Sequence, residues 1–425
     1  MIFFSLGPVI HTETVASGSQ STAIPVSNSL HVSPPVLSSY TVEGLQRTHP
    51  EVLKPFLDPY VGKPYTSSNE QAMIQSLRSL GLFHSITLLP EPLGPEQVKL
   101  HVQLEEKWTL IPIPMGGATS GGNVYGGLFL FESNLFGWNK KFFGGAFYGN
   151  TVFQGMIGYI DPRFFGSYQS LMARFGVGSE IVVSRSTEGI SFRQYKKTKI
   201  DAGADLSFPL WKGFSVGTGV QYRDHQINND YETPFSPPTG WRSLGPTLTL
   251  RYQDLSYGQV LTYGVLSSLR YERAFEPGGD DSYDTFLLQA QVYAPLGRAH
   301  RIGARIQGFT ARGLPPVLDN QVSGKFLKTI GDDVFSNSVL TGQLAFEGIP
   351  LHFSWGAPTV VLFYEGGVFR DQSPGSQDPY YWVHGPGAGF RIYLTRVAVP
   401  AFGFDVTYSF STQKVYGFVN VGFQM

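Results

Sequence analysis

Apolar and polar residues alternate one by one along most of this sequence, and this pattern constrains the fold more than any other feature. The alternation is clear from Ile200 to Phe208, from Phe286 to Val292 and from Ile302 to Ile306. Successive side chains of a β-strand point to opposite faces, so each segment is predicted to be a strand with one apolar face. No helical pattern follows residue 107. The larger part of the chain is therefore expected to be all-β.

The composition of the strand faces distinguishes a soluble sheet from a membrane barrel. The apolar positions include many small and aromatic residues, because the chain contains 50 Gly, 33 Phe and 22 Tyr. Charged residues make up 15% of the chain, compared with about 25% in an average protein. Transmembrane barrels combine alternating strands with aromatic girdles, and their closure satisfies the backbone hydrogen bonds inside lipid. We therefore predict a transmembrane barrel; a soluble propeller or tandem sandwich is the alternative.

Sixteen segments of the C-terminal region have the length and the pattern of barrel strands. They are residues 123–134, 138–149, 152–161, 168–178, 182–194, 196–208, 212–226, 241–254, 258–273, 282–294, 299–311, 337–348, 357–369, 382–394, 400–410 and 414–425. The longest interval between them lies at about 312–336, and a loop of this length usually has a function. We predict a membrane all-β fold over residues 109–425, a 16-stranded antiparallel transmembrane β-barrel.

The sequence ends on an alternating apolar stripe that belongs to one face of the last predicted strand. Its members are Val415, Val419, Val421, Phe423 and Met425, with Gly417 in the same row. A soluble protein rarely ends on such an exposed edge strand, because an open edge invites aggregation. We therefore interpret the last four residues of the stripe as the closure signal of the barrel: Val419, Val421, Phe423 and Met425.

The first 108 residues are organised differently. Residues 1–37 combine a signal-like apolar start with a leader rich in Ser, Pro, Thr and Val, and this leader is expected to be extended. Residues 38–108 are predicted to form one small α+β domain. Its expected elements are a strand at 39–43, a helix from a capping box at Thr48–Glu51 to Leu57, a helix from Ser68 to Leu80, and strands at 85–89 and 98–104.

Several kinds of function are not supported by the residues present. The chain has no Cys and a net charge of −1, so it offers no thiolate metal site and no basic footprint for nucleic acid. Its nine His residues show no metal-ligand spacing. Gly213–Gly217 matches the G-x-S-x-G pattern of serine hydrolases, but it lies in a strand pattern without a following helix. We predict a non-enzymatic protein without cofactor, metal or nucleic-acid partner.

Several short motifs resemble one known family in their order and spacing. They are Val42–Leu45, Leu80–Phe83 and Leu104–Lys107 in the N-terminal domain, and Asp161–Gly166, Tyr293–Leu296, Gly385–Arg391 and Phe404–Asp405 in the barrel. The first group resembles a POTRA (polypeptide-transport-associated) domain. The second group resembles the barrel of the bacterial surface antigen family, the BamA/TamA-type assembly proteins. The resemblance implies an outer-membrane protein of a diderm bacterium, with the POTRA domain in the periplasm.

The same resemblance implies a role for the long interval at 312–336. In the family, this extracellular loop folds back into the barrel, and an Arg-Gly-aromatic motif at its tip pairs with acidic residues of the inner wall. Here Leu327–Ile330 reads Leu-Lys-Thr-Ile, so a charge is kept but the guanidinium and the glycine are lost. The implied loop-lumen lock joins Lys328 to Glu347, Glu365 or Asp405. The alternative is that each carboxylate is only a solvated group of the lumen.

Two classes of function remain open from the sequence. The first is the assembly, insertion or translocation of outer-membrane proteins. In this class the POTRA domain binds extended client segments by strand addition, and the Gly-rich strand at 123–132 meets the last strand at a weak seam. The implied partners are outer-membrane lipid, unfolded client proteins and periplasmic proteins that bind the POTRA domain. The second class is a passive pore or surface barrel, which the altered loop motif favours.

Overall fold

The computed structural model of the protein describes residues 34–119, 122–228, 231–257, 261–297, 300–331, 333–349, 353, 356–376, 379–394 and 400–421. These residues divide into two compact units. One unit consists of Pro112–Phe131 and the residues from Phe142 onwards, and the other consists of the residues up to Ile111 together with Glu132–Lys141. No helix among the described residues is long and apolar enough to cross a membrane.

A small α+β fold precedes the barrel strands, as predicted. Its elements are β1 (Val36–Glu43), α1 (Lys54–Leu57), α2 (Ser67–Ser79), β2 (Phe83–Pro92) and β3 (Gln97–Glu106). The three strands form a sheet in the order β1-β3-β2, in which β1 runs parallel to β3 and β2 runs antiparallel to it. One face of the sheet packs against the helices through a buried apolar cluster that includes Leu53, Leu57, Met73, Leu77 and Leu100.

The two helices of this fold show where the sequence prediction was accurate and where it was wrong. The helix α2 has the expected apolar face, with Met73 and Leu77 buried, but its N-cap is Thr66, whose hydroxyl accepts from the Asn69 amide at 3.2 Å. The helix predicted from Thr48 to Leu57 is instead a 3₁₀ turn at Pro50–Val52 followed by the short α1. Proline removes backbone N–H donors here, so a continuous helix does not form.

A carboxylate at the end of β3 holds the segment in which the capping box was predicted. The backbone N–H groups of Arg47 and Thr48 donate to Glu106 at 2.9 and 2.8 Å. Burial acts to raise the pKa of Glu106, but the hydrogen bonds from Thr48, Arg47 and Gln46 outweigh it and lower the pKa below its ordinary value of 4.5. The carboxylate form is therefore favoured by folding.

This arrangement predicts that the small unit loses stability in acid. Because the folded pKa of Glu106 is lowered, its contribution is complete above about pH 4.5 and is lost as the pH falls through the folded pKa. Glu106→Gln should cost about 1–2 kcal/mol at neutral pH and weaken the acid dependence. Hydrogen exchange at the Arg47 and Thr48 amides of the whole chain measures both effects. Unchanged exchange in the variant would show that Glu106 does not hold this segment.

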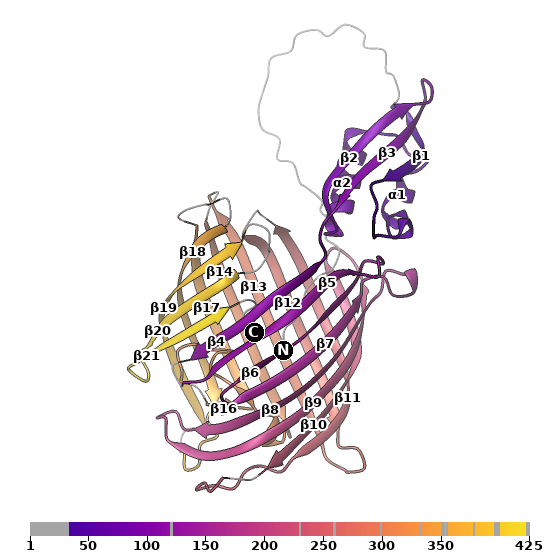
Figure 1. The fold of residues 1–425 in the computed structure, drawn as a ribbon. Helices are drawn as coiled ribbons and strands as arrows, with labels where there is room; N and C mark the ends of the chain where they lie inside the picture. Colours follow the sequence, from indigo (N-terminus) through magenta and orange to yellow (C-terminus); the bar gives the residue numbers. More distant parts are fainter. Residues whose placement is uncertain are drawn as a thin grey trace. The chain divides into compact units, whose positions relative to one another are not determined.

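The C-terminal region forms a closed antiparallel barrel, and the described residues contribute sixteen strands to it, as predicted (Figure 1). The strands are β4 (Leu110–Thr119), β5 (Val124–Leu135), β6 (Lys140–Gly149), β7 (Val152–Asp161), β8 (Ser170–Arg185), β9 (Ser191–Pro209), β10 (Phe214–Asn228), β11 (Trp241–Tyr257), β12 (Thr262–Phe275), β13 (Ser282–Leu296), β14 (His300–Arg312), β17 (Ser338–Gly348), β18 (Gly356–Arg370), β19 (Tyr380–Leu394), β20 (Pro400–Ser409) and β21 (Lys414–Val421).

The predicted number of strands is right although two assignments were wrong. The strand predicted at 182–194 does not exist as a separate element, because its residues belong to the end of β8 and the beginning of β9. The strand β4 was missed, since Pro112 and Pro114 argue against a strand that pairs on both sides. Consequently the last strand, β21, pairs with β4 and not with the strand predicted at 123–132.

The wall of the barrel carries its apolar residues on the outside. In β11, Leu248 and Leu250 are 47% and 50% exposed, whereas the neighbouring Thr247 is only 3% exposed. The inward positions of nearby strands instead form ion pairs, such as Arg174 with Asp205 at 2.8 Å. This distribution is the inverse of a soluble core and matches a wall that faces lipid.

Candidate functional site

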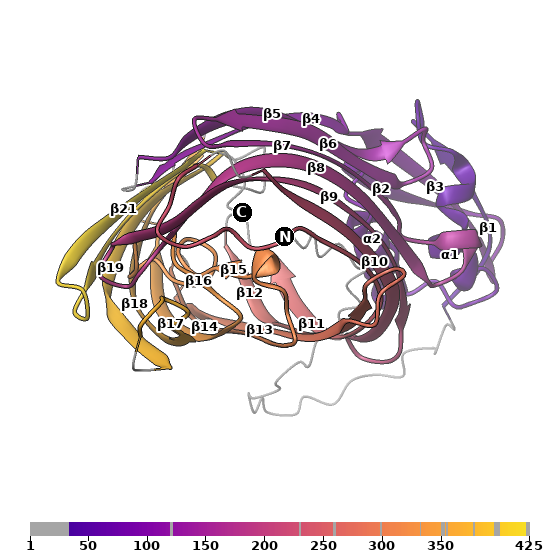
Figure 2. The same cartoon turned by 90° about the horizontal axis from the view of Figure 1, so that it is seen from below.

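The segment between β14 and β17 lies within the ring of barrel strands. It contains a 3₁₀ turn at Pro316–Leu318 and two short strands, β15 (Asn320–Gln321) and β16 (Phe335–Ser336), which pair with each other. Figure 2 shows β15 and β16 inside the ring of barrel strands. We call residues 313–337 the inner loop. The inner loop is therefore folded and lies in the lumen of the barrel.

An apolar cluster anchors the inner loop to one side of the wall. The loop contributes Val322, Phe326, Leu327, Ile330 and Val334, and the wall contributes Val339, Phe369 and Val383. Leu327 and Ile330 are each 1% exposed, and burying an apolar side chain of this size contributes about 1.5–3 kcal/mol. Packing therefore stabilises the docked loop independently of its charges.

Lys328, the predicted cationic member of the lock, reaches a buried carboxylate on β20. Its Nζ lies 2.7 Å from Asp405 Oδ2, and Asp405 is fully buried. Arg391 of β19 binds the same carboxylate, with Nη2 2.7 and 2.8 Å from its two oxygens. The ammonium group also lies 5.4 Å from the centre of the Phe363 ring. One carboxylate thus serves two cations, of which only Lys328 comes from the loop.

Glu365 of β18 binds the tip of the loop through its backbone. Its Oε1 accepts hydrogen bonds from the amides of Lys328 and, at 2.8 Å, Thr329. On the opposite side, the Thr407 hydroxyl donates to the Lys328 carbonyl at 2.6 Å. Thr329 does not have the left-handed backbone conformation that favours glycine. The Lys-Thr pair of this chain is therefore compatible with a docked tip, although it replaces the Arg-Gly of the family motif.

Glu347, the third carboxylate proposed as a partner of Lys328, has a different described partner. It lies at the end of β17 opposite Arg301 of β14 and accepts from the Arg301 Nε at 2.7 Å. The Arg301 guanidinium also lies over the ring of Tyr293, 4.2 Å from its centre. The structure therefore brings together Lys328, Glu365 and Asp405, and it places Glu347 in a separate pair on the wall.

Two contacts on the other side of the barrel were not predicted. The Arg185 Nε of β8 lies 3.3 Å from Asp333 Oδ2, and the Arg185 amide donates to the Asp333 carbonyl at 2.9 Å. The Lys197 ammonium lies 3.5 Å from the Val317 carbonyl. The inner loop is thus held from both sides of the lumen. The sequence did contain one sign that this loop is docked: it carries several apolar residues between 322 and 334, and an exposed loop seldom carries so many.

The strand β21 closes the barrel against β4. Four residue pairs join these strands within the described residues: Phe418 with Thr119, Val419 with Ala118, Asn420 with Gly117 and Val421 with Gly116. Two members of the predicted closure signal, Val419 and Val421, therefore lie in the closing ladder. The other two, Phe423 and Met425, lie outside the described residues.

Comparison with known proteins identifies the family of this barrel. The Omp85 superfamily domain matches residues 134–368, which is more than half of the chain. The chain belongs to the Omp85 superfamily. The match begins near the end of β5 and continues into β18, so it includes the whole inner loop.

Individual relatives of this Omp85 protein agree with the assignment. BamA, the outer membrane protein assembly factor of Neisseria meningitidis serogroup B, is 26% identical over 211 residues; the match covers 48% of this chain and 26% of the relative. The chain therefore spans about a quarter of the length of that curated relative. The match in sequence is to a part of a much longer protein.

Two solved structures resemble the whole fold. BamA from Haemophilus ducreyi lacking POTRA domains 1–3 has a TM-score of 0.63 at 14% identity, with 92% of this chain and 85% of that chain covered. CdiB from Escherichia coli has a TM-score of 0.68 at 12% identity, with 92% and 76% covered. At this identity the likeness establishes the architecture of an outer-membrane barrel with a small α+β unit before it.

The described part of this Omp85 protein contains no group of three or more His, Asp or Glu residues that could hold a metal ion. Its buried carboxylates are instead paired with cations or with backbone amides, as Asp405 and Glu365 show. The candidate site consists of the two features described above: the docked inner loop and the closing ladder between β4 and β21.

Proposed function

We propose that this Omp85 protein takes part in the insertion or translocation of outer-membrane proteins, and that its barrel admits client segments at the join between β21 and β4. The closing ladder between β21 and β4 carries this proposal. These two strands are neighbours in the barrel but lie at opposite ends of the strand order in the chain, so no connecting turn holds them together. Their separation therefore requires only that backbone hydrogen bonds break.

The sequence of β4 supports the same proposal. Pro112 and Pro114 have no N–H to donate to a neighbouring strand. The next two paired positions, Gly116 and Gly117, have no side chains for cross-strand packing. A strand with these residues pairs weakly, so a client strand can replace β21 as the partner of β4 at a small cost.

We further propose that the N-terminal α+β unit is a POTRA domain that lies in the periplasm and binds client segments by strand addition at β2. The strands β1 and β2 form the two edges of the sheet. The outer edge of β1 is bonded to the chain around residues 62–65, through Leu37 with Lys63 and Gly62. Among the described residues β2 carries no such covering segment, so its backbone groups are available to an extended peptide.

Depletion of the protein in its native bacterium tests this function. An insertion or translocation role predicts that the abundance of other outer-membrane barrels falls, as measured by quantitative proteomics of isolated outer membranes. Expression of the intact chain from a second locus should restore it. Unchanged levels of all other barrels and surface proteins would favour the alternative, a passive pore or surface barrel.

A further inference from the structure

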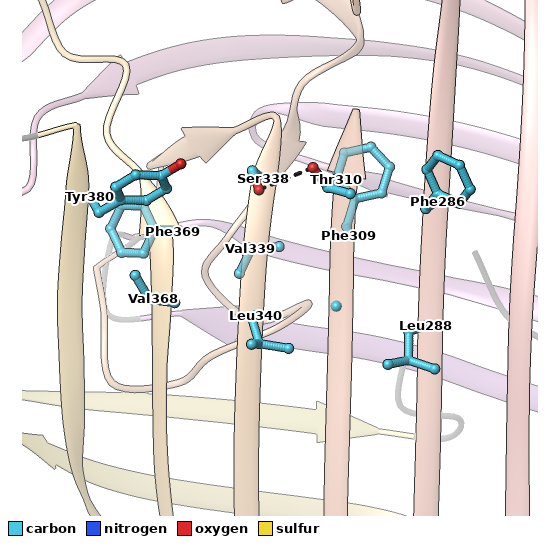
Figure 3. Close-up of a pocket in the computed structure, with 11 residues that line it drawn as sticks. Phe286, Leu288, Phe309, Thr310, Ser338, Val339, Leu340, Val368, Phe369 and Tyr380 are labelled. Carbon is cyan, nitrogen blue, oxygen red and sulfur yellow. Dashed lines mark hydrogen bonds between the residues drawn. The ribbon is translucent and has the colours of Figure 1, made fainter. Parts of the chain in front are cut away.

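A hollow lies on the outer wall of the barrel, across β13, β14, β17 and β18. Its volume is 230 Å³, and it is bordered by side chains from these strands and by Tyr380 of β19 (Figure 3). Phe286, Leu288 and Leu340 are 46%, 39% and 51% exposed, so they point away from the lumen. The hollow is therefore open to the lipid around the barrel. Its lining also includes Val339 and Phe369, which belong to the apolar cluster behind the wall that anchors the inner loop.

Small residues create this hollow in a wall of large ones. Gly308 of β14 lies between Leu288 of β13 and Leu340 of β17 in the strand register. A Cβ atom placed on Gly308 would lie 3.3 Å from the Leu340 side chain. One row further along, the Ser338 hydroxyl donates to Thr310 Oγ1 at 3.3 Å (Figure 3). The floor of the hollow is thus mostly apolar, which suits an unbranched apolar chain.

Two arginines lie at one end of the hollow. Arg312 is the last residue of β14, two residues beyond Thr310, and Arg370 ends β18 opposite Tyr380. Both are exposed, and the alternation of their strands places them on the outward face. The acidic group nearest in register is Asp284, opposite Arg312, and Asp284 accepts from the Tyr271 hydroxyl at 2.6 Å and lies 4.0 Å from Arg273. The turn between β12 and β13 adds Glu276, Asp280 and Asp281 at the same end of the barrel. Arg312 and Arg370 are thus two outward guanidinium groups next to the hollow, in a surface of mixed charge.

We propose that this surface binds a phosphorylated, acylated glycolipid, with one acyl chain in the hollow and a phosphate held by Arg312 and Arg370. An acyl chain matches the hollow, because it is apolar and unbranched and the site faces lipid. A phosphate matches the arginines, because guanidinium groups bind it through paired hydrogen bonds. Two residues along a strand advance about 6.6 Å, a short step from the buried end of the chain to a headgroup.

The choice of a glycolipid rests on the proposed function. If the end at which β4 begins faces the periplasm, antiparallel order places the ends of β14 and β18 in the outer leaflet. That leaflet is the one in which a phosphorylated glycolipid would meet these arginines. The binding surface itself depends only on the residues of the outer wall, so a binding assay in detergent does not depend on orientation or on client insertion.

Native mass spectrometry of the purified whole chain, with lipid A or phosphatidylglycerol added, tests the acyl site. Gly308→Leu fills the hollow and removes contacts to about two methylene groups, so we expect roughly tenfold lower lipid A occupancy. Gly342→Leu is the matched control, because it lies on the same outward face of β17 and a Cβ there meets nothing within 4 Å. Its occupancy should equal that of the unaltered chain.

The headgroup contact is tested in the same assay. Arg312→Gln and Arg370→Gln should each lower lipid A occupancy about fivefold, whereas Lys414→Gln, an exposed cation at the start of β21, should not. Equal loss in Gly308→Leu and Gly342→Leu would overturn the acyl site. Equal retention of phosphatidylglycerol and lipid A would overturn the glycolipid as its occupant. A fall in barrel assembly on depletion, with lipid binding unaffected in Gly308→Leu, would leave the proposed function intact and reject this site.

Discussion

A disulfide between β4 and β21 is expected to abolish the proposed insertion or translocation activity while leaving the fold intact. The chain contains no Cys, so the pair Ala118→Cys and Val419→Cys introduces the only thiols. These residues are direct partners in the closing ladder. Opposite residues of antiparallel strands have Cα atoms about 4.5–5.5 Å apart, within the roughly 4.4–6.8 Å that a disulfide spans. The bond would prevent the proposed exchange of β21 for a client strand.

The measurement is complementation of a depleted strain, read as the abundance of other outer-membrane barrels. The oxidised variant should fail to restore them, and a reductant should recover its activity. The control is Ser267→Cys with Ala290→Cys, which joins β12 and β13 in the middle of a long ladder and should complement in both redox states. Complementation by the oxidised Ala118–Val419 variant would refute opening at this join and would favour a passive barrel.

The fold was predictable because the alternation of a lipid-facing wall is a local property of the sequence. Strands with strict alternation, such as β11 and β13, were placed to within a few residues. The strand β4 was not, because its prolines and glycines weaken the pattern. The two prolines also distinguish β4 from its neighbours β5 and β21, which contain none. The sequence signal is therefore weakest where the barrel is expected to open.

The candidate site was only partly predictable, since the pairing of charges depends on register across the barrel. The resemblance placed Lys328 at the loop tip, and the three acidic candidates followed from their inward positions. Alternation alone cannot decide which carboxylate a loop reaches. Glu347 faces Arg301 in the ladder between β14 and β17, and Arg391 shares Asp405 with the loop. Both facts follow from cross-strand neighbours that a single segment does not reveal.

Asp405→Asn is expected to destabilise the docked loop more than Lys328→Met. Asp405 is fully buried and binds both Lys328 and Arg391. Its replacement removes the negative charge that both cations contact, which should cost about 3–5 kcal/mol of the free energy of unfolding. Lys328→Met leaves Asp405 paired with Arg391 and keeps the apolar stem of the side chain. Its cost should be about 1.5–3 kcal/mol, the contribution of one hydrogen bond to a charged group.

Protease access to residues 313–337 and the temperature of the heat-dependent gel shift measure these costs in the folded barrel. The double variant decides between an ion pair and independent contacts. Both single variants lose the contact between Lys328 and Asp405, and the double variant loses it only once, so the combined cost should fall below the sum of the single costs by at least about 1 kcal/mol. If the two costs add, or if Asp405→Asn is no worse than Lys328→Met, the pair behaves as a solvated surface contact. The loop would then be held by its apolar cluster and by Glu365, whose bonds to the backbone do not depend on the residue at position 328.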